Sequence, residues 1–101
     1  MGFSEEMVDK VWQKGEQVIV DGKVLVDWRK DQCGAWINRG KYGDRESDYG
    51  WEIDHISTKA NGGGDELSNL RPLHWENNVA KSDGNLKCAL TSSGNKNVKK
   101  T

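Results

Sequence analysis

The middle of the chain contains four segments of different character in a fixed order. Residues 51–56 alternate apolar and polar side chains, which is typical of a half-buried β-strand. A glycine-rich stretch over residues 61–65 follows, where left-handed backbone angles cost little and the chain can reverse. Residues 67–73 form a second apolar run, which Pro72 restricts to an edge or irregular strand. Residues 76–82 predict a short helix, so the order expected here is strand, turn, strand and helix.

The N-terminal part of the chain predicts one helix and one hairpin. Ser4 favours a helix start, and acidic residues follow it directly. Apolar residues then recur every three or four positions, as on an amphipathic helix that ends near Gly15. These residues are Met7, Val8, Val11 and Trp12. Two β-branched runs over residues 18–26 flank Asp21 and Gly22, a pair that favours a tight hairpin turn.

Composition limits the chain to one small domain. It has 101 residues, of which 31% are charged and 34% hydrophobic, so its core is modest. Five tryptophans supply large apolar faces, and we therefore expect a compact fold rather than a disordered chain. Residues 28–50 mix short apolar pieces with basic and glycine-rich ones, which predicts a strand and a loop. The sequence has no repeat, proline-rich linker or apolar stretch of transmembrane length, so a single α+β domain over residues 1–101 is expected.

Four polar residues in the central segment are not readily explained by packing. Asp54 and His55 are neighbours on the first strand, and both can serve one site only where that strand ends or bends. The glycine turn is expected to bring Asn69 back alongside His55, and the short helix to project Asn78 towards the strand pair. Each residue alone has an ordinary interpretation, as a surface hydrogen bond, a turn or a solvent-facing amide. Their occurrence together predicts a functional site.

This segment resembles the HNH endonucleases, which fold as a ββα-metal finger. The resemblance covers residues 51–83, with the Asp-His pair, the glycine-rich turn, Leu-Ser-Asn-Leu at residues 67–70 and Asn-Val-Ala-Lys-Ser at residues 78–82. Upstream, Cys33-Gly-Ala and the residues from Tyr49 to the Asp-His pair are similar to the lead-in of small bacterial and phage members. The resemblance implies an HNH finger in an α+β fold, preceded by the N-terminal helix and the small hairpin.

The resemblance also implies a role for each of the four polar residues. His55 falls at the position of the general base that deprotonates the attacking water, and a neutral imidazole is able to accept that proton. Asp54 and Asn78 fall at metal-ligand positions, with asparagine where many relatives have histidine. Asn69 falls at the middle position, where hydrogen bonds hold the loop and orient the histidine ring. The implied reaction is hydrolysis of phosphodiester bonds in DNA, leaving 5′-phosphate and 3′-hydroxyl ends.

The implied cofactor is one divalent metal ion. Carboxylate and amide oxygens suit hard ions, so Mg²⁺ is expected and Mn²⁺ is a plausible substitute, with Zn²⁺ or Ni²⁺ as further candidates. Many relatives place cysteines of a structural zinc site at the positions that here hold His74 and Asn77, so no structural zinc site is expected. We interpret His74 as a hydrogen-bonded histidine at a strand end, with an extra metal ligand as the alternative. Ser82 could also face the ion from the next helical turn.

Basic residues indicate where nucleic acid could be contacted. The formal net charge is −1, which argues against tight non-specific wrapping of DNA. The candidate phosphate contacts are Arg39, Lys41, Arg45, Lys81 and Lys87. Acidic residues interleave with the first three of these, so a mixed-charge surface loop is the alternative there. From residue 84 onwards the chain has four lysines and no acid, and residues 90–101 are expected to form a flexible basic tail.

Cysteine usage and the first residues bear on location. Cys33 and Cys88 are a weak basis for a disulfide scaffold, and the start of the chain lacks the basic and apolar regions of a targeting peptide. We therefore expect free thiols in a cytoplasmic protein with no membrane partner. The expected partner is DNA, whether double-stranded, structured or single-stranded, and the expected oligomeric state is a monomer or weak dimer.

One finger supplies one cleavage centre, so nicking of a single strand is the expected activity. Two alternatives stay open. The first is a nucleic-acid-binding module that has kept the finger and lost cleavage. The second is an accessory protein of a phage or mobile element that works through protein contacts.

Overall fold

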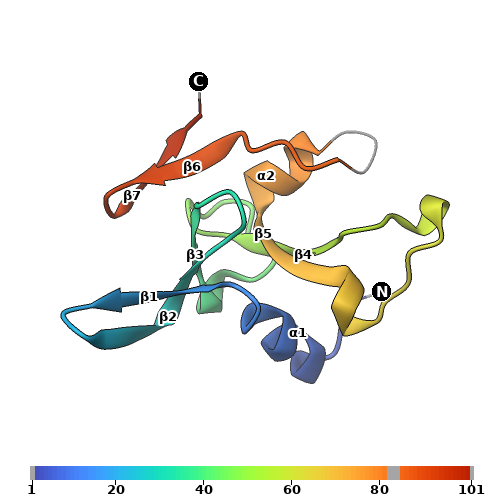
Figure 1. Cartoon of the computed structure of the whole chain (residues 1–101), viewed down its shortest axis with the longest axis horizontal. Helices are drawn as coiled ribbons and strands as arrows, with labels where there is room; N and C mark the ends of the chain where they lie inside the picture. Colours follow the sequence, from blue (N-terminus) through green and yellow to red (C-terminus); the bar gives the residue numbers. More distant parts are fainter. Residues whose placement is uncertain (1, 82–84, 101) are drawn as a thin grey trace.

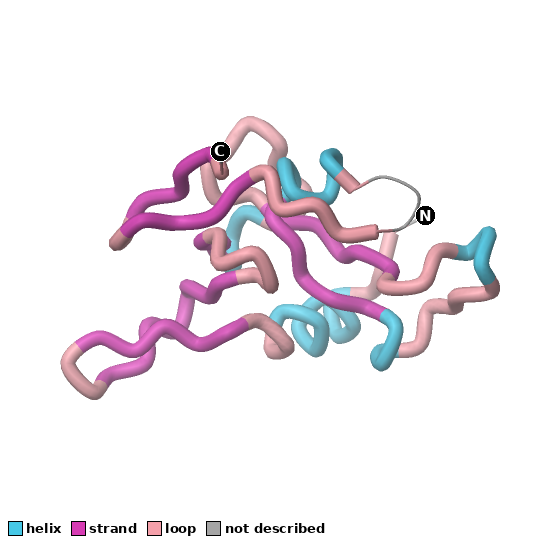
Figure 2. The backbone as a smooth tube through the Cα atoms, turned by 45° about the horizontal axis from the view of Figure 1, so that its top comes forward, coloured by secondary structure: helices cyan, strands magenta, loops and turns pink. Residues whose placement is uncertain are grey.

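The computed structural model describes residues 2–81 and 85–100 as two α-helices with short strands arranged in three sheets (Figures 1 and 2). In chain order the elements are α1 (Glu5–Trp12), β1 (Glu16–Val20), β2 (Lys23–Lys30), β3 (Trp36–Asn38), η1 (Arg39–Lys41), β4 (Trp51–His55), η2 (Lys59–Asn61), η3 (Leu67–Asn69), β5 (Leu70–His74), α2 (Trp75–Ala80), β6 (Leu90–Ser93) and β7 (Lys96–Lys99), where η marks a 3₁₀ helix. The sheets are β1-β2-β3, β4-β5 and β6-β7, and all their pairs are antiparallel. The predicted α+β fold in a single compact domain is confirmed.

The N-terminal helix begins where the sequence predicts. The Ser4 hydroxyl accepts a hydrogen bond from the Met7 backbone N–H at 3.1 Å, which caps α1. The helix buries Val8, Val11 and Trp12, one apolar stripe of the predicted pattern. Because these side chains pack against Trp51 and Leu70, α1 lies with this face towards the strand pair β4-β5.

The predicted hairpin is confirmed as β1 and β2. Asp21 and Gly22 both have positive φ angles, of 51° and 76°, as a two-residue turn that matches the twist of the strands requires. β3 then adds to the other edge of β2, with Trp36 opposite Lys30. The strand and loop predicted within residues 28–50 are therefore present.

The strands β4 and β5 and the helix α2 form the predicted ββα unit. Asp54 lies opposite Arg71, and His55 lies opposite Leu70. Directly opposed residues share one face of a sheet, and successive residues along a strand alternate between faces. Trp51 packs with α1 on one face, and Figure 1 shows α2 on the other side of the strand pair. Asp54 therefore faces α2, whereas His55 ends the strand on the face towards α1.

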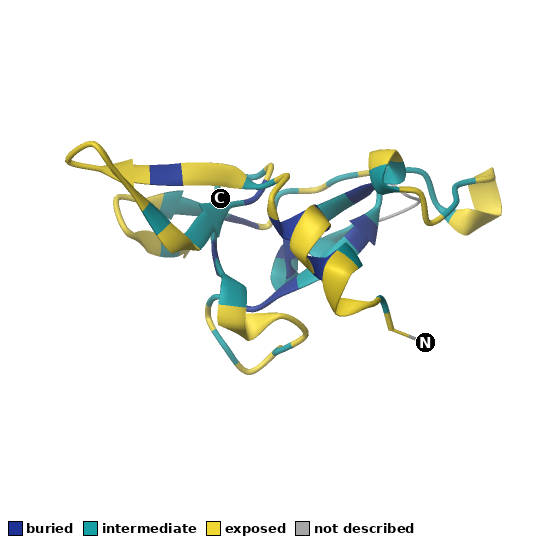
Figure 3. Cartoon of the chain, turned by 90° about the horizontal axis from the view of Figure 1, so that it is seen from below, coloured by how far each residue is buried: buried dark blue, intermediate teal, exposed yellow. Residues whose placement is uncertain are grey.

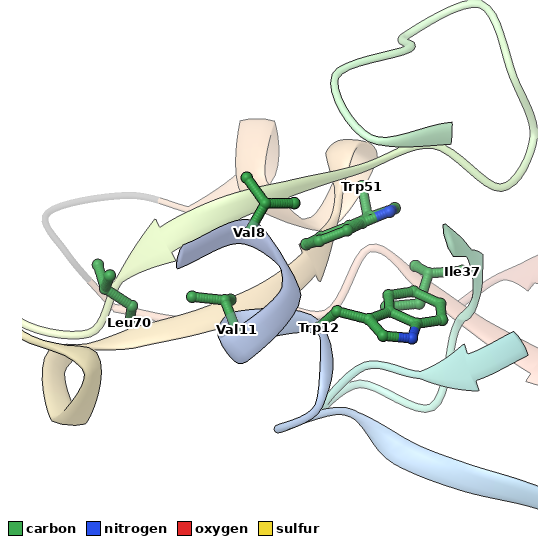
Figure 4. Close-up of a cluster of buried hydrophobic side chains, with 6 residues drawn as sticks. All are labelled: Val8, Val11, Trp12, Ile37, Trp51 and Leu70. Carbon is green, nitrogen blue, oxygen red and sulfur yellow. The ribbon is translucent and has the colours of Figure 1, made fainter. Parts of the chain in front are cut away.

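The core lies between α1 and the strand pair (Figures 3 and 4). Its buried members are Val8, Val11, Trp12, Ile37, Trp51 and Leu70. The Trp12 and Trp51 rings contact each other with centroids 5.2 Å apart. Each large side chain buried here stabilises the fold by about 1.5–3 kcal/mol. This core fixes the strand that ends in the Asp-His pair.

The prediction of a flexible tail over residues 90–101 is wrong. Residues 90–99 form the β6-β7 hairpin, with Leu90 opposite Lys99. Asn97 attaches the hairpin to β3, since its side chain accepts from the Trp36 N–H at 2.6 Å and donates to the Trp36 carbonyl at 2.9 Å. The hairpin turns at Gly94, whose φ angle is positive at 61°, and its contact with Trp36 spans 61 residues of sequence.

The prediction of free thiols is also wrong. Cys33 and Cys88 form a disulfide bond across 55 residues of sequence. The bond joins the loop after β2 to the segment before β6. Because disulfides persist in oxidising environments, the argument for a cytoplasmic location no longer holds. Among the residues that the structure describes, no helix has the length and apolar character needed to cross a membrane.

Candidate active site

Asp54 is a buried carboxylate held between two cations. Its side chain is 4% exposed, and Oδ2 accepts a hydrogen bond from Arg71 Nε at 2.7 Å. Its Oδ1 accepts from the Lys81 ammonium, which also donates to the His55 carbonyl at 3.0 Å. The Arg71 and Lys81 side chains are 12% and 10% exposed. Because two cations share one carboxylate, the group as a whole carries one positive charge.

His55 lies at the end of β4 with its ring partly open to solvent. The side chain is 24% exposed, and Nε2 lies 2.7 Å from Asp65 Oδ1. The hydrogen bond from His55 lowers the pKa of Asp65, which is therefore an acceptor at neutral pH. With Nε2 donating to this carboxylate, Nδ1 is the ring atom able to accept a proton. The ring of Phe3 lies beside it, with centroids 6.1 Å apart.

Asn69 holds the loop between the two strands. Its Oδ1 accepts from the Ser57 N–H at 2.8 Å, while Nδ2 donates to the Ser57 and Gly64 carbonyls at 3.0 and 2.8 Å. Gly63 is needed in this loop because a Cβ there would lie 1.8 Å from the Ser57 carbonyl oxygen. The loop is held as the sequence predicts, but the ring of His55 bonds to Asp65 and not to Asn69.

The Asn78 amide contacts the carboxylate of Glu52, a residue for which the sequence predicts no role. Its Nδ2 donates to Glu52 Oε1 at 2.8 Å, and no contact joins it to Asp54 in the described part of the chain. Arg45 binds the same Glu52 through two hydrogen bonds of 2.6 and 2.9 Å. The hydrogen bond from Arg45 lowers the pKa of Glu52, with burial acting against it and Asn78 reinforcing it. Glu52 and Asp54 are two residues apart on one strand, so both face α2.

Comparison with known proteins supports the family. Residues 39–84 match the family model described as HNH endonuclease. This segment belongs to the HNH endonuclease family. No curated protein and no solved structure matches the chain. HNH domains are generally nucleases that act on DNA, and the match covers Asp54, His55, Asn69 and Asn78.

The resemblance implies zinc-binding cysteines in many relatives at the positions that hold His74 and Asn77 here. In this chain, both side chains stabilise the finger through buried hydrogen bonds. His74 is fully buried, its Nδ1 accepts from the Glu76 N–H at 3.1 Å, and its Nε2 donates to the Asp48 carbonyl at 2.8 Å. It caps the start of α2, and both of its ring nitrogens are used. Asn77 is also fully buried and exchanges two hydrogen bonds with the Leu90 backbone.

Asp31 connects these buried groups, and the sequence gives no signal for that role. Its carboxylate accepts four hydrogen bonds, each of 2.9 Å, from the N–H groups of Cys33, Ala35 and His74 and from the Asn77 amide. The side chain is almost completely buried. Together with the nearby disulfide, Asp31 fixes the junction of β5 and α2 against the loop after β2.

Three of the five predicted nucleic-acid contacts are engaged in ion pairs. The pairs are Arg39 with Asp9, Arg45 with Glu52 and Lys81 with Asp54. Lys41 and Lys87 are exposed and have no side-chain partner within residues 2–81 and 85–100. Ser82 lies outside the described residues. The HNH domain therefore offers fewer free cations around the finger than its sequence suggests.

Two functional candidates were missed in the sequence and are visible in the structure. Asp65 contacts His55, and Glu52 contacts Asn78. The strand period could have indicated Glu52, because residues two apart share a face with Asp54. Asp65 has no comparable signal, since its approach to His55 depends on how the glycine loop folds.

HNH nucleases generally use a divalent metal ion, and the oxygen ligands fit one by their chemistry. The described residues contain no group of three or more His, Cys, Asp or Glu side chains that could hold an ion. The candidate set is the Asp54 carboxylate and the Asn78 amide oxygen, both of a type that Mg²⁺ and Mn²⁺ accept. Both Asp54 oxygens already bind cationic groups, so a divalent ion could use this carboxylate only where one of them, such as the Lys81 ammonium, moved away.

Proposed function

We propose that this protein is a metal-dependent endonuclease that hydrolyses phosphodiester bonds of DNA, with His55 as the general base. The observation that carries this proposal is the hydrogen bond between His55 and Asp65, beside a buried Asp54. A ring that is partly exposed, fixed through one nitrogen and without a hydrogen bond at the other within the described residues suits a base that takes a proton from water. The family match supports the same reaction class.

The proton transfer follows from the two nitrogens of the His55 ring. Nε2–H donates to Asp65, which leaves the lone pair of Nδ1 to accept a proton from the attacking water. The ring becomes an imidazolium, and the adjacent Asp65 carboxylate stabilises its positive charge. Asn69 keeps the loop closed, so Asp65 stays within reach of the ring. We propose positioning roles for Asp65 and Asn69.

Asp54 and Asn78 would hold one divalent ion, with Mg²⁺ expected and Mn²⁺ as a substitute. When bound, such an ion polarises the phosphate and stabilises negative charge on the leaving 3′ oxygen. Glu52 uses the Nδ2 of Asn78, which leaves the amide oxygen for the ion. The products would carry 5′-phosphate and 3′-hydroxyl ends, and one site per chain would nick one strand at a time.

Nicking of supercoiled plasmid tests this proposal. The protein should nick with Mg²⁺ or Mn²⁺, and activity should disappear with EDTA and in His55→Ala. Asp27→Asn, which removes an exposed carboxylate on β2, is the matched control and should nick normally. Circular dichroism spectra should show that each variant is folded. Nicking by folded His55→Ala at the normal rate would contradict the assigned base.

A second function is favoured by the ion pairs of Asp54. If Arg71 and Lys81 keep both oxygens of Asp54, the finger is a nucleic-acid-binding module without cleavage. That function predicts band shifts of DNA with no nicking under any divalent ion. The two functions differ in whether a bound metal ion displaces the Lys81 ammonium from Asp54.

A further inference from the structure

A cleft beside the finger is not used by the proposed catalytic residues. It has a volume of about 660 Å³, within the range of about 300–1,000 Å³ typical of ligand sites. It lies between β5 and two other segments of the chain, residues 14–16 and 30–34. The side chains that matter for its chemistry are Lys14, Lys30, Gln32, Ile56 and Arg71.

The cleft lies next to the candidate active site. Ile56 directly follows His55 in the chain, and Arg71 lies opposite Asp54 in the strand pair. Ile56 is 43% exposed, which leaves an open apolar border at this end. A polymer that enters the active site would therefore meet the cleft directly beside it.

Positive charge in the cleft exceeds the negative charge that faces it. Lys14, Lys30 and Arg71 line it, together with the acids Glu16 and Asp31. Asp31 is 3% exposed and its carboxylate accepts four hydrogen bonds, so this carboxylate is turned into the protein. The cations therefore outnumber the single carboxylate at the surface of the cleft.

Arg71 is only partly neutralised. Its Nε binds Asp54, but Asp54 is shared with Lys81, and its Nη1 donates to the neutral amide of Gln32 at 2.9 Å. The guanidinium of Arg71 is mostly buried and is only partly neutralised, because Lys81 shares the negative charge of Asp54. Such a group favours binding of a further anion.

Lys14 adds a second fixed cation. Its ammonium donates to the backbone carbonyls of Leu67 and Leu70, which hold it near β5. Burial lowers the pKa of Lys14, and the charge of Arg71 lowers it further, so two like charges lie close together. An anion between them would relieve this repulsion.

We propose that the cleft binds the phosphodiester backbone of the nucleic-acid substrate, next to the phosphate that is cleaved. This inference rests on the proposed nuclease function and names the surface through which the substrate is held. Phosphate oxygens suit the guanidinium of Arg71 and the ammonium groups of Lys14 and Lys30. The bound segment consists of phosphates that flank the reacting one.

Binding of a fluorescent DNA duplex in EDTA tests the cleft without cleavage. Lys30→Gln removes one cleft cation, and fluorescence anisotropy should show about a five- to tenfold loss of affinity near 0.1 M KCl. The slope of log affinity against log salt should become shallower by about one. Lys23→Gln, an equal charge change on an exposed residue outside the cleft, is the control and should bind as wild type does.

Two further variants separate charge from packing. The Lys30 ammonium lies 5.4 Å from the Trp36 ring centroid, so Lys30→Arg should keep both the charge and the affinity. Gln32→Glu adds a carboxylate that pairs with Arg71 and should weaken DNA binding by a similar factor. Wild-type affinity in both Lys30→Gln and Gln32→Glu would overturn the proposal, whether or not the protein nicks DNA.

Inorganic phosphate distinguishes a polymer site from a small-anion site. At equal ionic strength it should displace the duplex no better than sulfate does. Displacement by phosphate alone at low concentration would overturn the polymer assignment. Binding that depends on the cleft without nicking supports the cleft and contradicts only the proposed catalysis.

Discussion

The Asn78 amide donates a hydrogen bond to Glu52 Oε1 across 2.8 Å, and Glu52 is itself bound by Arg45. This pairing fixes which end of the amide is free. Nδ2 is used, so Oδ1 is the atom available to an ion. A residue on β4 thus orients a residue on α2, and the proposed ligand set depends on both elements.

Removing Glu52 should therefore weaken metal binding. We expect Glu52→Ala to lower Mn²⁺ affinity by about 10- to 100-fold, as loss of a group that orients a ligand typically does. Isothermal titration calorimetry measures this directly. Glu46→Ala makes the same charge change at an exposed position and should leave the affinity unchanged. Equal Mn²⁺ affinity in Glu52→Ala and wild type would show that Glu52 does not position Asn78.

Asp65 should matter for rate and not for DNA affinity. In Asp65→Asn the charge that stabilises the His55 imidazolium is gone, and a general base contributes about 10²–10⁴-fold. We expect nicking to slow by at least about tenfold, with DNA binding in EDTA unchanged. Glu66→Gln, on an exposed neighbour in the same loop, is the control. A normal single-turnover rate in Asp65→Asn would remove Asp65 from the mechanism.

Lowering the pH should remove the stabilisation of the fold that the Arg45–Glu52 ion pair provides. The hydrogen bond from Arg45 lowers the pKa of Glu52 below its ordinary value of 4.5. A carboxyl whose pKa is lower in the folded state stabilises the fold above its unfolded pKa. That contribution is lost as the pH falls through the folded pKa.

Thermal unfolding should reveal this contribution. Arg45→Ala should have a lower Tm than wild type near neutral pH, and the difference should shrink from about pH 5 to about pH 3. Lys41→Ala, a nearby exposed cation without a side-chain partner in the described chain, should show no such convergence. A Tm difference that stays constant with pH would mean that Arg45 acts through packing.

The disulfide should contribute measurably to stability. Closing 55 residues with one bond stabilises the fold by about 4 kcal/mol in the chain-entropy model. Urea unfolding with and without a reductant should show a corresponding fall in the midpoint. The Cys33→Ser variant should match the reduced protein and should not respond to the reductant. An unchanged midpoint on reduction would mean that the bond does not support the fold.

The parts of the fold that depend on neighbouring residues could be predicted from the sequence. The serine cap of α1 and the Asp21-Gly22 turn follow from local backbone preferences. The ββα order follows from the strand period and the glycine turn, which together bring Asn69 beside the end of β4.

The parts that depend on distant contacts could not be predicted. The attachment of the β6-β7 hairpin to β3 relies on Asn97 meeting Trp36, and the disulfide relies on Cys33 meeting Cys88. Neither pair has a local pattern. The same holds within the site, because the approach of Lys81 to Asp54 depends on the angle between α2 and β4.

Anomalous scattering from a crystal grown with Mn²⁺ tests directly whether an ion binds between Asp54 and Asn78. We expect a peak bonded to a carboxylate oxygen of Asp54 and to the amide oxygen of Asn78, with the Lys81 ammonium moved off Asp54. No peak at these oxygens, with Arg71 and Lys81 still bound to Asp54, would contradict it.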